Sequence, residues 1–361
     1  MEKSTRQQIP SIFVSKNNYP NIAVGFLSTT KDQFHDNPQF WANRNYQIPL
    51  ISGLRKDLLH TPFVANVKER ANKQLELAQE FALAKRAVNA EITYISRNTQ
   101  SLKSQGEAIP FGPSAKLSRV TPIENTPVDH RLEKAYYDID ASATTSLHEL
   151  YKKGVQEHIL SKLLSVGGLG RGQGRKLVPT RWSITAVDDT LCKSLKDKIV
   201  TEDTLPYQAF MGDYLGNYFL VLIYDGPFMF HFIEVMPNKV VKEDCESALG
   251  RTEYAKETAG GYYAAKEGVL SYLASIKKQA TVVCIRFITD EYYQGLGVWV
   301  VRESVKKTMA TQSILFSDKE LLSTYAKKFS QKKYGVNLQP FIDGSLVLKT
   351  LKSQKRLFEF S

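Results

Sequence analysis

Cysteine is scarce in this sequence, and long apolar runs are missing from it. The three cysteines, Cys192, Cys245 and Cys284, are too far apart to form a C-x-x-C pair, so neither a disulfide framework nor a cysteine zinc site is indicated. No apolar run approaches the ~20 residues of a membrane-spanning helix. The first residues also lack the apolar core of a secretory signal. These absences predict a cytoplasmic protein that does not use a membrane as a partner.

Acidic residues are outnumbered by basic ones. The 361 residues include 48 Lys and Arg against 37 Asp and Glu, a net charge of +11, and a field of this sign attracts polyanions such as nucleic acids. Residues 319–361 hold nine basic and three acidic side chains, so the C-terminal end is the basic end. Solvated lysine-rich helix faces would give the same excess, and charge alone does not identify the polyanion.

The segment over residues 167–189, GGLGRGQGRKLVPTRWSITAVDD, combines glycines, cations, an aromatic ring and two adjacent carboxylates. Backbone N–H groups of a glycine-rich loop and cationic side chains both suit a phosphate-bearing ligand. A standard phosphate loop is excluded, because Gln173 stands where the P-loop lysine or the last glycine of a dinucleotide loop is required. We expect a flexible basic loop over residues 167–176 and then an edge strand over residues 177–185, since Pro179 limits ladder hydrogen bonding.

This segment supplies most of the candidate site residues. The candidates for binding phosphate or nucleic acid are Gly172, Gly174, Arg175, Lys176, Arg181 and Trp182, the last by stacking on a ring. Asp188 and Asp189 are the catalytic candidates, as a base or as cation ligands. The structural alternative is that these aspartates only cap a short helix that continues to about Lys198, and that Trp182 belongs to the core.

A second candidate segment is Gly260-Gly261-Tyr262-Tyr263. It precedes a predicted helix over residues 264–277, whose free backbone N–H groups could bind an anion. The tyrosines could stack on a base or a sugar. A glycine hinge followed by two interface tyrosines explains the same residues.

Other acidic and histidine pairs give weaker signals. Asp138 and Asp140 would share one face of an extended segment, as a hard cation requires, or would cap the following helix. His231 and Glu234 fall on opposite faces of a predicted strand, so a shared site is not indicated. A metal and a cofactor therefore stay unassigned.

The apolar pattern predicts a mixed α+β fold in which helices flank a central, mostly antiparallel sheet. One hairpin is expected near the N-terminus and another at the centre of the sheet, where Asp225-Gly226-Pro227 separates two apolar runs. The expected strands are residues 12–14, 22–24, 218–224, 228–236 and 282–288. One helix is expected to begin at Asn37-Pro38. Further helices are expected over residues 67–90, 144–166, 264–277, 298–309 and 317–329.

Four prolines between residues 96 and 130 indicate a connection between domains, or else an ordered functional loop. We therefore expect three parts. They are an N-terminal helical and hairpin region with this proline-rich connection over residues 1–130, an α/β core domain with the site over residues 131–348, and a basic tail over residues 349–361.

The tail ends in Gln354-Lys355-Arg356-Leu357-Phe358-Glu359-Phe360. A glutamine, an aliphatic residue three places on and an aromatic residue three further are typical of the turn that inserts into the hydrophobic pocket of the DNA polymerase sliding clamp (PCNA). This pattern predicts clamp binding through Gln354, Leu357, Phe358 and Phe360. Ser361 replaces the second aromatic of the full motif, so we expect weaker affinity. A tail docked on its own domain is the alternative.

The sequence RKLVPTRWSITAVDD at residues 175–189 resembles the signature segment of the archaeal Nre DNA-repair proteins. Residues 9–14, 36–41, 109–115 and 258–263 are similar to the same family, so the resemblance spans nearly the whole chain. Many members begin with a four-cysteine zinc-finger segment, which this sequence does not contain, and a DNA-binding role of that finger is not carried over. The resemblance implies DNA damage repair and a C-terminal contact with the clamp, but no catalytic mechanism.

The sequence thus predicts a DNA-repair protein that the clamp recruits and that binds phosphate or nucleic acid at residues 167–189. An enzyme and a non-catalytic adaptor both fit these features. A third possibility is a nucleotide-binding or nucleotide-processing enzyme or sensor that does not contact DNA directly.

Overall fold

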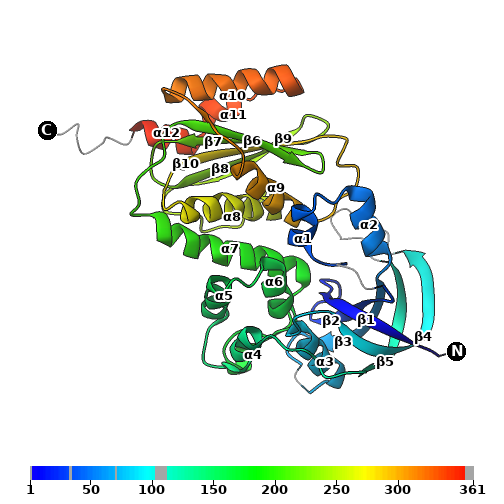
Figure 1. Ribbon diagram of the computed structural model, residues 1–361. Coiled ribbons are helices and arrows are strands. Elements are labelled where there is room, and N and C mark those ends of the chain that lie inside the picture. Colours follow the sequence, from blue (N-terminus) through cyan, green and yellow to red (C-terminus); the bar gives the residue numbers. More distant parts are fainter. Residues whose placement is uncertain (1, 32–34, 70, 102–111, 354–361) are drawn as a thin grey trace. The chain divides into compact units, whose positions relative to one another are not determined.

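The computed structural model describes every residue except 1, 32–34, 70, 102–111 and 354–361 (Figure 1). Its described residues form helices α1 to α12 and strands β1 to β11 in two sheets, so the predicted mixed α+β fold is confirmed. They divide into two compact units, residues 1–191 with 295–297 and residues 192–294 with 298–361. This division lies within helix α7 (Thr180–Ile199) and does not coincide with residue 130 or 348.

The first unit contains a closed five-stranded barrel in the order β1-β2-β3-β5-β4. Its strands are β1 (Lys3–Val14), β2 (Asn21–Thr29), β3 (Leu59–Asn66), β4 (Val88–Ser101) and β5 (Pro113–Pro122). A register shift between Gln8 and Ser11 lets the first part of β1 pair with β4 and the second part with β2. The barrel closes where β3 and β5 pair in parallel through His60 and Ser114. Closure leaves these strands without an open sheet edge.

Alternating apolar residues fill the barrel. In β2, Ile22, Val24 and Phe26 are fully buried and form part of one hydrophobic core with side chains from the other strands. The predicted N-terminal hairpin is confirmed, since Val14 is paired with Val24. The proline-rich stretch contributes a strand instead of only a connection, and Pro113 and Pro122 lie at the two ends of β5, where a strand tolerates proline.

The first unit also contains short helices. They are α1 (Pro38–Asn43), α2 (Ile48–Lys56), α3 (Lys73–Ala82), α4 (His130–Tyr137), α5 (Ala143–Lys152) and α6 (Glu157–Ser165). The predicted start of α1 is confirmed, because the Asn37 side chain accepts a hydrogen bond from the Phe40 amide. The single helix expected over residues 144–166 is wrong. Gly154 separates α5 from α6 with a φ of +76°, a conformation that glycine adopts at little cost.

The second unit is built on a six-stranded sheet in the order β11-β6-β7-β10-β8-β9. Its strands are β6 (Gln208–Tyr214), β7 (Asn217–Tyr224), β8 (Met229–Val235), β9 (Val241–Glu246), β10 (Thr281–Ile288) and β11 (Ile314–Leu315). The expected central hairpin is wrong, because β10 lies between β7 and β8, antiparallel to the first and parallel to the second. The remaining pairs are antiparallel, as predicted for this sheet.

Helices cover both faces of this sheet, with α8 and α9 on one face and α10, α11 and α12 on the other (Figure 1). They are α8 (Gly260–Ser275), α9 (Trp299–Met309), α10 (Lys319–Tyr334), α11 (Gln339–Gly344) and α12 (Leu346–Ser353). Residues 281–287 of β10 are buried, as expected for a central strand between two helical layers. Within the described ranges, every helix is too short or too polar to cross a membrane.

Candidate functional site

The second half of the predicted site segment is helical. Residues 167–179 form a loop that contains the short 3-10 turn η1 (Gly172–Gly174), and helix α7 begins at Thr180. The edge strand expected over residues 177–185 is therefore wrong, because residues 177–179 belong to the loop and those from Thr180 onward are helical. Ser183, Val187 and Leu191 are all buried, and this four-residue spacing is that of a helix face packed on a core. Packing of that face overrides the β propensity of the intervening residues.

The two catalytic candidates lie inside α7 and do not cap it. Asp188 is fully buried, whereas Asp189 is half-buried. Consecutive residues of a helix point in different directions. Asp189 lies two turns after Trp182 on the same side of α7, and Asp188 faces the protein interior. Their predicted role as a base or cation ligand is not tested by this geometry and stays a prediction.

The glycines of the loop make contacts within the protein. The Gly172 amide donates to the Ile139 carbonyl at 2.8 Å, and the Gly174 amide donates to the Arg171 carbonyl at 2.8 Å. Gly167 has a φ of +72°, and a Cβ there would lie 3.1 Å from the Lys176 carbonyl oxygen. These glycines allow the loop to turn tightly, and the two predicted phosphate-binding amides already have carbonyl acceptors.

Arg175 also faces the protein. Its Nε donates to the Gly170 carbonyl at 2.7 Å, and its terminal nitrogens donate to the carbonyls of Tyr136 and Asp138. The guanidinium carbon lies 5.5 Å from the centre of the Tyr136 ring. Burial lowers the pKa of Arg175. The side chain thus joins the glycine-rich loop to the end of α4.

Trp182 lies at the surface, where its ring is paired with a ring from a distant part of the chain. Trp182 and Tyr19 are each 49% exposed, and their ring centres are 5.8 Å apart with a tilt of 44°. Tyr19 belongs to the loop between β1 and β2. Tyr19 was not among the residues predicted for the site, and no local signal could have paired it with Trp182.

Backbone hydrogen bonds hold these two segments together. The Val67 amide donates to the Pro20 carbonyl at 2.9 Å, and the Leu177 amide donates to the Val67 carbonyl at 2.9 Å. The Val14 amide donates to Thr180 Oγ1 at 2.9 Å, which joins the first residue of α7 to the barrel.

Exposed cations lie within a few residues of both rings in the sequence. Lys176 and Arg181 lie beside the start of α7, and Lys16 lies in the same loop as Tyr19. We call the surface formed by Lys16, Tyr19, Lys176, Arg181 and Trp182 the ring-pair surface. Of the cations predicted to bind phosphate, Lys176 and Arg181 are therefore exposed near the ring pair, and Arg175 is not part of this surface.

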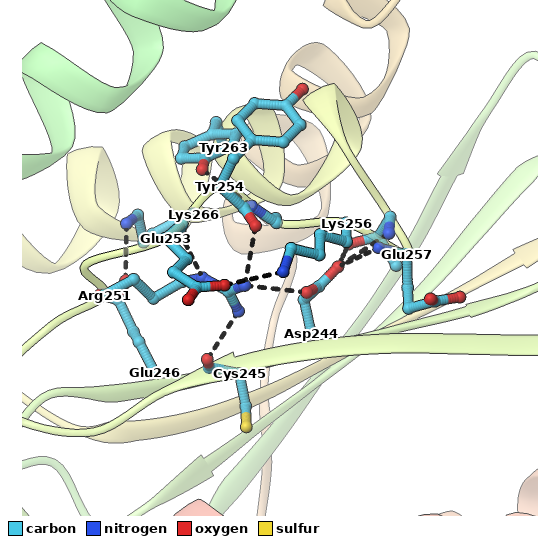
Figure 2. Close-up of polar contacts among 12 residues, drawn as sticks. Asp244, Cys245, Glu246, Arg251, Glu253, Tyr254, Lys256, Glu257, Tyr263 and Lys266 are labelled. Carbon is cyan, nitrogen blue, oxygen red and sulfur yellow. Dashed lines mark hydrogen bonds and ion pairs between the residues drawn. The ribbon is translucent and has the colours of Figure 1, made fainter.

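The second predicted segment, Gly260 to Tyr263, belongs to the other compact unit and forms the first turn of α8. Figure 2 shows its surroundings. Tyr263 is buried, its hydroxyl accepts a hydrogen bond from the Ala255 amide at 3.1 Å, and its ring stacks on Tyr254 with centres 5.3 Å apart. Tyr262 is fully buried, and burial raises the pKa of its hydroxyl. Both rings therefore pack inside the unit.

Charged groups around α8 are paired with one another. Asp244 accepts a hydrogen bond from Arg251 (Figure 2). It also accepts hydrogen bonds from the amide and the hydroxyl of Thr258. Lys266 and Glu246, both buried, form an ion pair at 2.9 Å. This network joins both Arg251 and Thr258, and Lys266 of α8, to β9, and each buried charge in it has a partner of opposite sign.

Potential metal ligands are dispersed. His231 contacts Ser345 at 3.0 Å and Glu243 at 2.8 Å, whereas Glu234 pairs with Arg286. The structure, within the residues that it describes, holds no group of three or more His, Cys, Asp and Glu side chains that could bind a metal ion. The clamp-binding candidates Gln354, Leu357, Phe358 and Phe360 lie outside the described residues, directly after α12.

Comparison with known proteins covers nearly the whole chain. The family model described as archaeal Nre, N-terminal, matches residues 2–241, and the one described as archaeal Nre, C-terminal, matches residues 246–360. The DNA repair protein NreA of Haloferax volcanii is 33% identical over 319 residues, which cover 82% of this chain and 76% of the relative. The DNA repair protein NreB of Archaeoglobus fulgidus is 32% identical over 367 residues, which cover 97% and 90%. No solved structure matches this chain. The chain therefore belongs to the archaeal Nre family, as its signature segment implied.

Proposed function

We propose that this protein acts in DNA repair by binding DNA at the ring-pair surface, and that the sliding clamp recruits it through residues 354–360. The names of its relatives support the repair role, and a net charge of +11 favours a polyanionic partner. The observation that carries the DNA contact is the half-exposed pair of Tyr19 and Trp182 beside exposed cations.

Each part of the ring-pair surface has a role in this proposal. Lys176 and Arg181 contact DNA phosphates, where a neutralised phosphate releases condensed counterions and makes binding depend on salt. Arg175, Gly172 and Gly174 support the loop through their contacts with carbonyl oxygens. Asp188 and Asp189 take no part in the proposed DNA contact.

Clamp recruitment rests on the tail. Helix α12 ends at Ser353, so the motif begins with the next residue. A short segment that folds onto a partner can insert apolar side chains into a groove while the rest of the protein keeps its fold. Basic residues 355 and 356 lie inside the motif and add positive charge near DNA threaded through the clamp.

The DNA contact is tested by fluorescence anisotropy of a labelled DNA oligonucleotide at several salt concentrations. We expect the double variant Lys176→Ala with Arg181→Ala to weaken binding and to lower the slope of log affinity against log salt by roughly 0.7–0.9 for each phosphate that is no longer neutralised. The matched control is Lys85→Ala with Arg86→Ala, an exposed pair of the same residue types elsewhere in the first unit, which should keep the wild-type slope.

Equal losses in the two double variants would contradict the assignment of the ring-pair surface. Saturable mononucleotide binding without salt-dependent DNA affinity would instead support a nucleotide sensor or nucleotide-processing enzyme.

A further inference from the structure

The barrel of the first unit has a recognisable topology. Five strands close in the order β1-β2-β3-β5-β4, β1 pairs with both β2 and β4, and α3 lies between β3 and β4 in the chain. This is the arrangement of the OB-fold, a barrel whose β2–β3 face and whose loops between β1 and β2 and between β4 and β5 bind oligonucleotides or oligosaccharides. The topology alone does not indicate which of these ligands is bound, but the side chains on the surface favour an oligonucleotide.

Tyr19 lies in the loop between β1 and β2, one of the ligand-binding loops of this topology. Its ring is paired with Trp182, and about half of each side chain is exposed. An exposed ring favours stacking with a planar base, and the bases of a duplex are already stacked within the helix and covered by its backbones. The ring pair therefore suits an unpaired base.

The outer β2–β3 face is open only in the half next to this loop. At one end, Leu27 and His60 are paired across the two strands and both are buried. Towards the other end, Ala23 is paired with Val64, which is 69% exposed. The open half therefore lies at the end of β3 that is joined by Val67 to the loop with Tyr19.

Exposed basic residues lie in the segments that meet at the same end of the barrel. Lys16 lies in the loop with Tyr19, and Lys176 and Arg181 lie on either side of the segment that leads into α7. Basic side chains along a strand of bases, with an aromatic ring between them, form the usual combination for single-stranded nucleic acid. A neutral oligosaccharide would gain nothing from these cations.

We propose that the ring-pair surface and the open half of the β2–β3 face bind single-stranded DNA, with a base stacked on the pair formed by Tyr19 and Trp182. This inference rests on the proposed function for the choice of DNA, and it adds the form of DNA that the surface selects. Lys16, Lys176 and Arg181 contact the phosphates on either side of the stacked base.

The first test uses intrinsic fluorescence. The protein has three tryptophans; Trp41 and Trp299 are buried and Trp182 is 49% exposed, so a base that stacks on the ring pair quenches mainly the emission of Trp182. We expect a thymidine oligonucleotide to quench the emission of the full-length protein. The variant Trp182→Phe should lose this quenching and keep most of the affinity, because phenylalanine restores a stacking surface.

The second test compares affinities for a single strand and for a hairpin duplex by anisotropy. We expect Tyr19→Ala and Trp182→Ala each to weaken single-strand binding by roughly 5- to 150-fold, the range for loss of a stacked base, and to leave duplex affinity unchanged. The control is Tyr137→Ala, which removes a 71% exposed tyrosine of α4 that also contacts a neighbouring ring. It should bind like the wild type.

The possible outcomes separate this inference from the proposed function. If the wild type shows no salt-dependent affinity for any DNA, the proposed function falls together with the inference. If Lys176 and Arg181 matter for binding but the ring variants lose single-strand and duplex affinity equally, or lose none, only the inference is overturned. Tighter binding of the same sequence as RNA also overturns it. Should Tyr19→Ala fail to fold in a thermal melt followed by circular dichroism, the two Trp182 variants decide.

Discussion

The guanidinium of Arg175 lies over the ring of Tyr136, 5.5 Å from its centre, and donates a hydrogen bond to the carbonyl of the same residue. Further hydrogen bonds reach the carbonyls of Gly170 and Asp138. A single cation therefore satisfies three backbone acceptors in two segments. Of the cations in the signature segment, Arg175 thus stabilises the loop, whereas Lys176 and Arg181 are exposed.

We expect Arg175→Ala to lower the free energy of unfolding by roughly 1–3 kcal/mol, because it leaves carbonyl acceptors without their donors. Arg175→Lys should recover only part of this loss, since an ammonium group cannot replace a planar guanidinium that reaches several acceptors. Urea denaturation measures both. A direct phosphate role for Arg175 would instead lower the salt slope of DNA binding while the unfolding free energy stays the same.

Gly25 and His60 face each other across β2 and β3 with no room for a further atom. A Cβ at position 25 would lie 2.1 Å from Nε2 of His60, which is buried. We expect Gly25→Ala to lower the free energy of unfolding by about 1–3 kcal/mol or more, as overpacking does. Gly53→Ala is the control, because its Cβ in α2 meets nothing within 4 Å, and helix propensity predicts a gain of up to about 1 kcal/mol. Similar losses in both variants would argue against the close approach.

Stability should fall in mild acid because of His60. Burial lowers its pKa from 6.5 to about 4, so between these values the unfolded chain binds a proton that the folded protein does not. The contribution of His60 is fully present above about pH 7 and is lost as the pH falls towards 4, by at most ~3 kcal/mol. Urea denaturation at several pH values should show a shallower slope for His60→Gln. An identical slope in both proteins would exclude this histidine as the cause.

The tail should bind the clamp independently of DNA. We expect Phe360→Ala and Leu357→Ala each to weaken clamp binding about tenfold or more, because apolar anchors of a short motif carry most of its affinity, and deletion of residues 352–361 to abolish it. Calorimetry with the purified sliding clamp measures this effect, and the anisotropy assay should show unchanged DNA binding by the point variants. Lys355→Ala is the control within the motif. A truncated protein that binds the clamp like the full chain would refute the assignment.

Local patterns predicted the elements better than their pairing. The hairpin expected around Asp225-Gly226-Pro227 failed because β10, from a much later part of the chain, is inserted between the two strands. The closed barrel was not predicted, since its closure depends on β5 pairing with β3 and on β1 pairing with β4. Such contacts depend on residues that are far apart in the sequence, and no short window contains both partners.

The residues of the candidate site were also only partly predictable from local sequence. Trp182, Lys176 and Arg181 were found from composition, and the structure places all three at the surface. Tyr19 could not be found in this way, because its position beside Trp182 depends on the backbone bonds that bring its loop to α7. The spacing of Ser183, Val187 and Leu191 was a readable helical signal, but the strand propensity of the residues between them outweighed it in the prediction.

The double pairing of β1 means that its hydrogen bonds can be completed only late in the synthesis of this protein. Ser4 is paired with Thr93, 89 positions further along the chain. At about 5–20 residues per second, a ribosome takes on the order of ten seconds to make the intervening chain. Throughout that interval, the row of amides and carbonyls in the first part of β1 that later pairs with β4 is hydrogen-bonded to water instead of to a strand. A chaperone that binds extended segments near the ribosomal exit would protect this row until its second neighbour emerges.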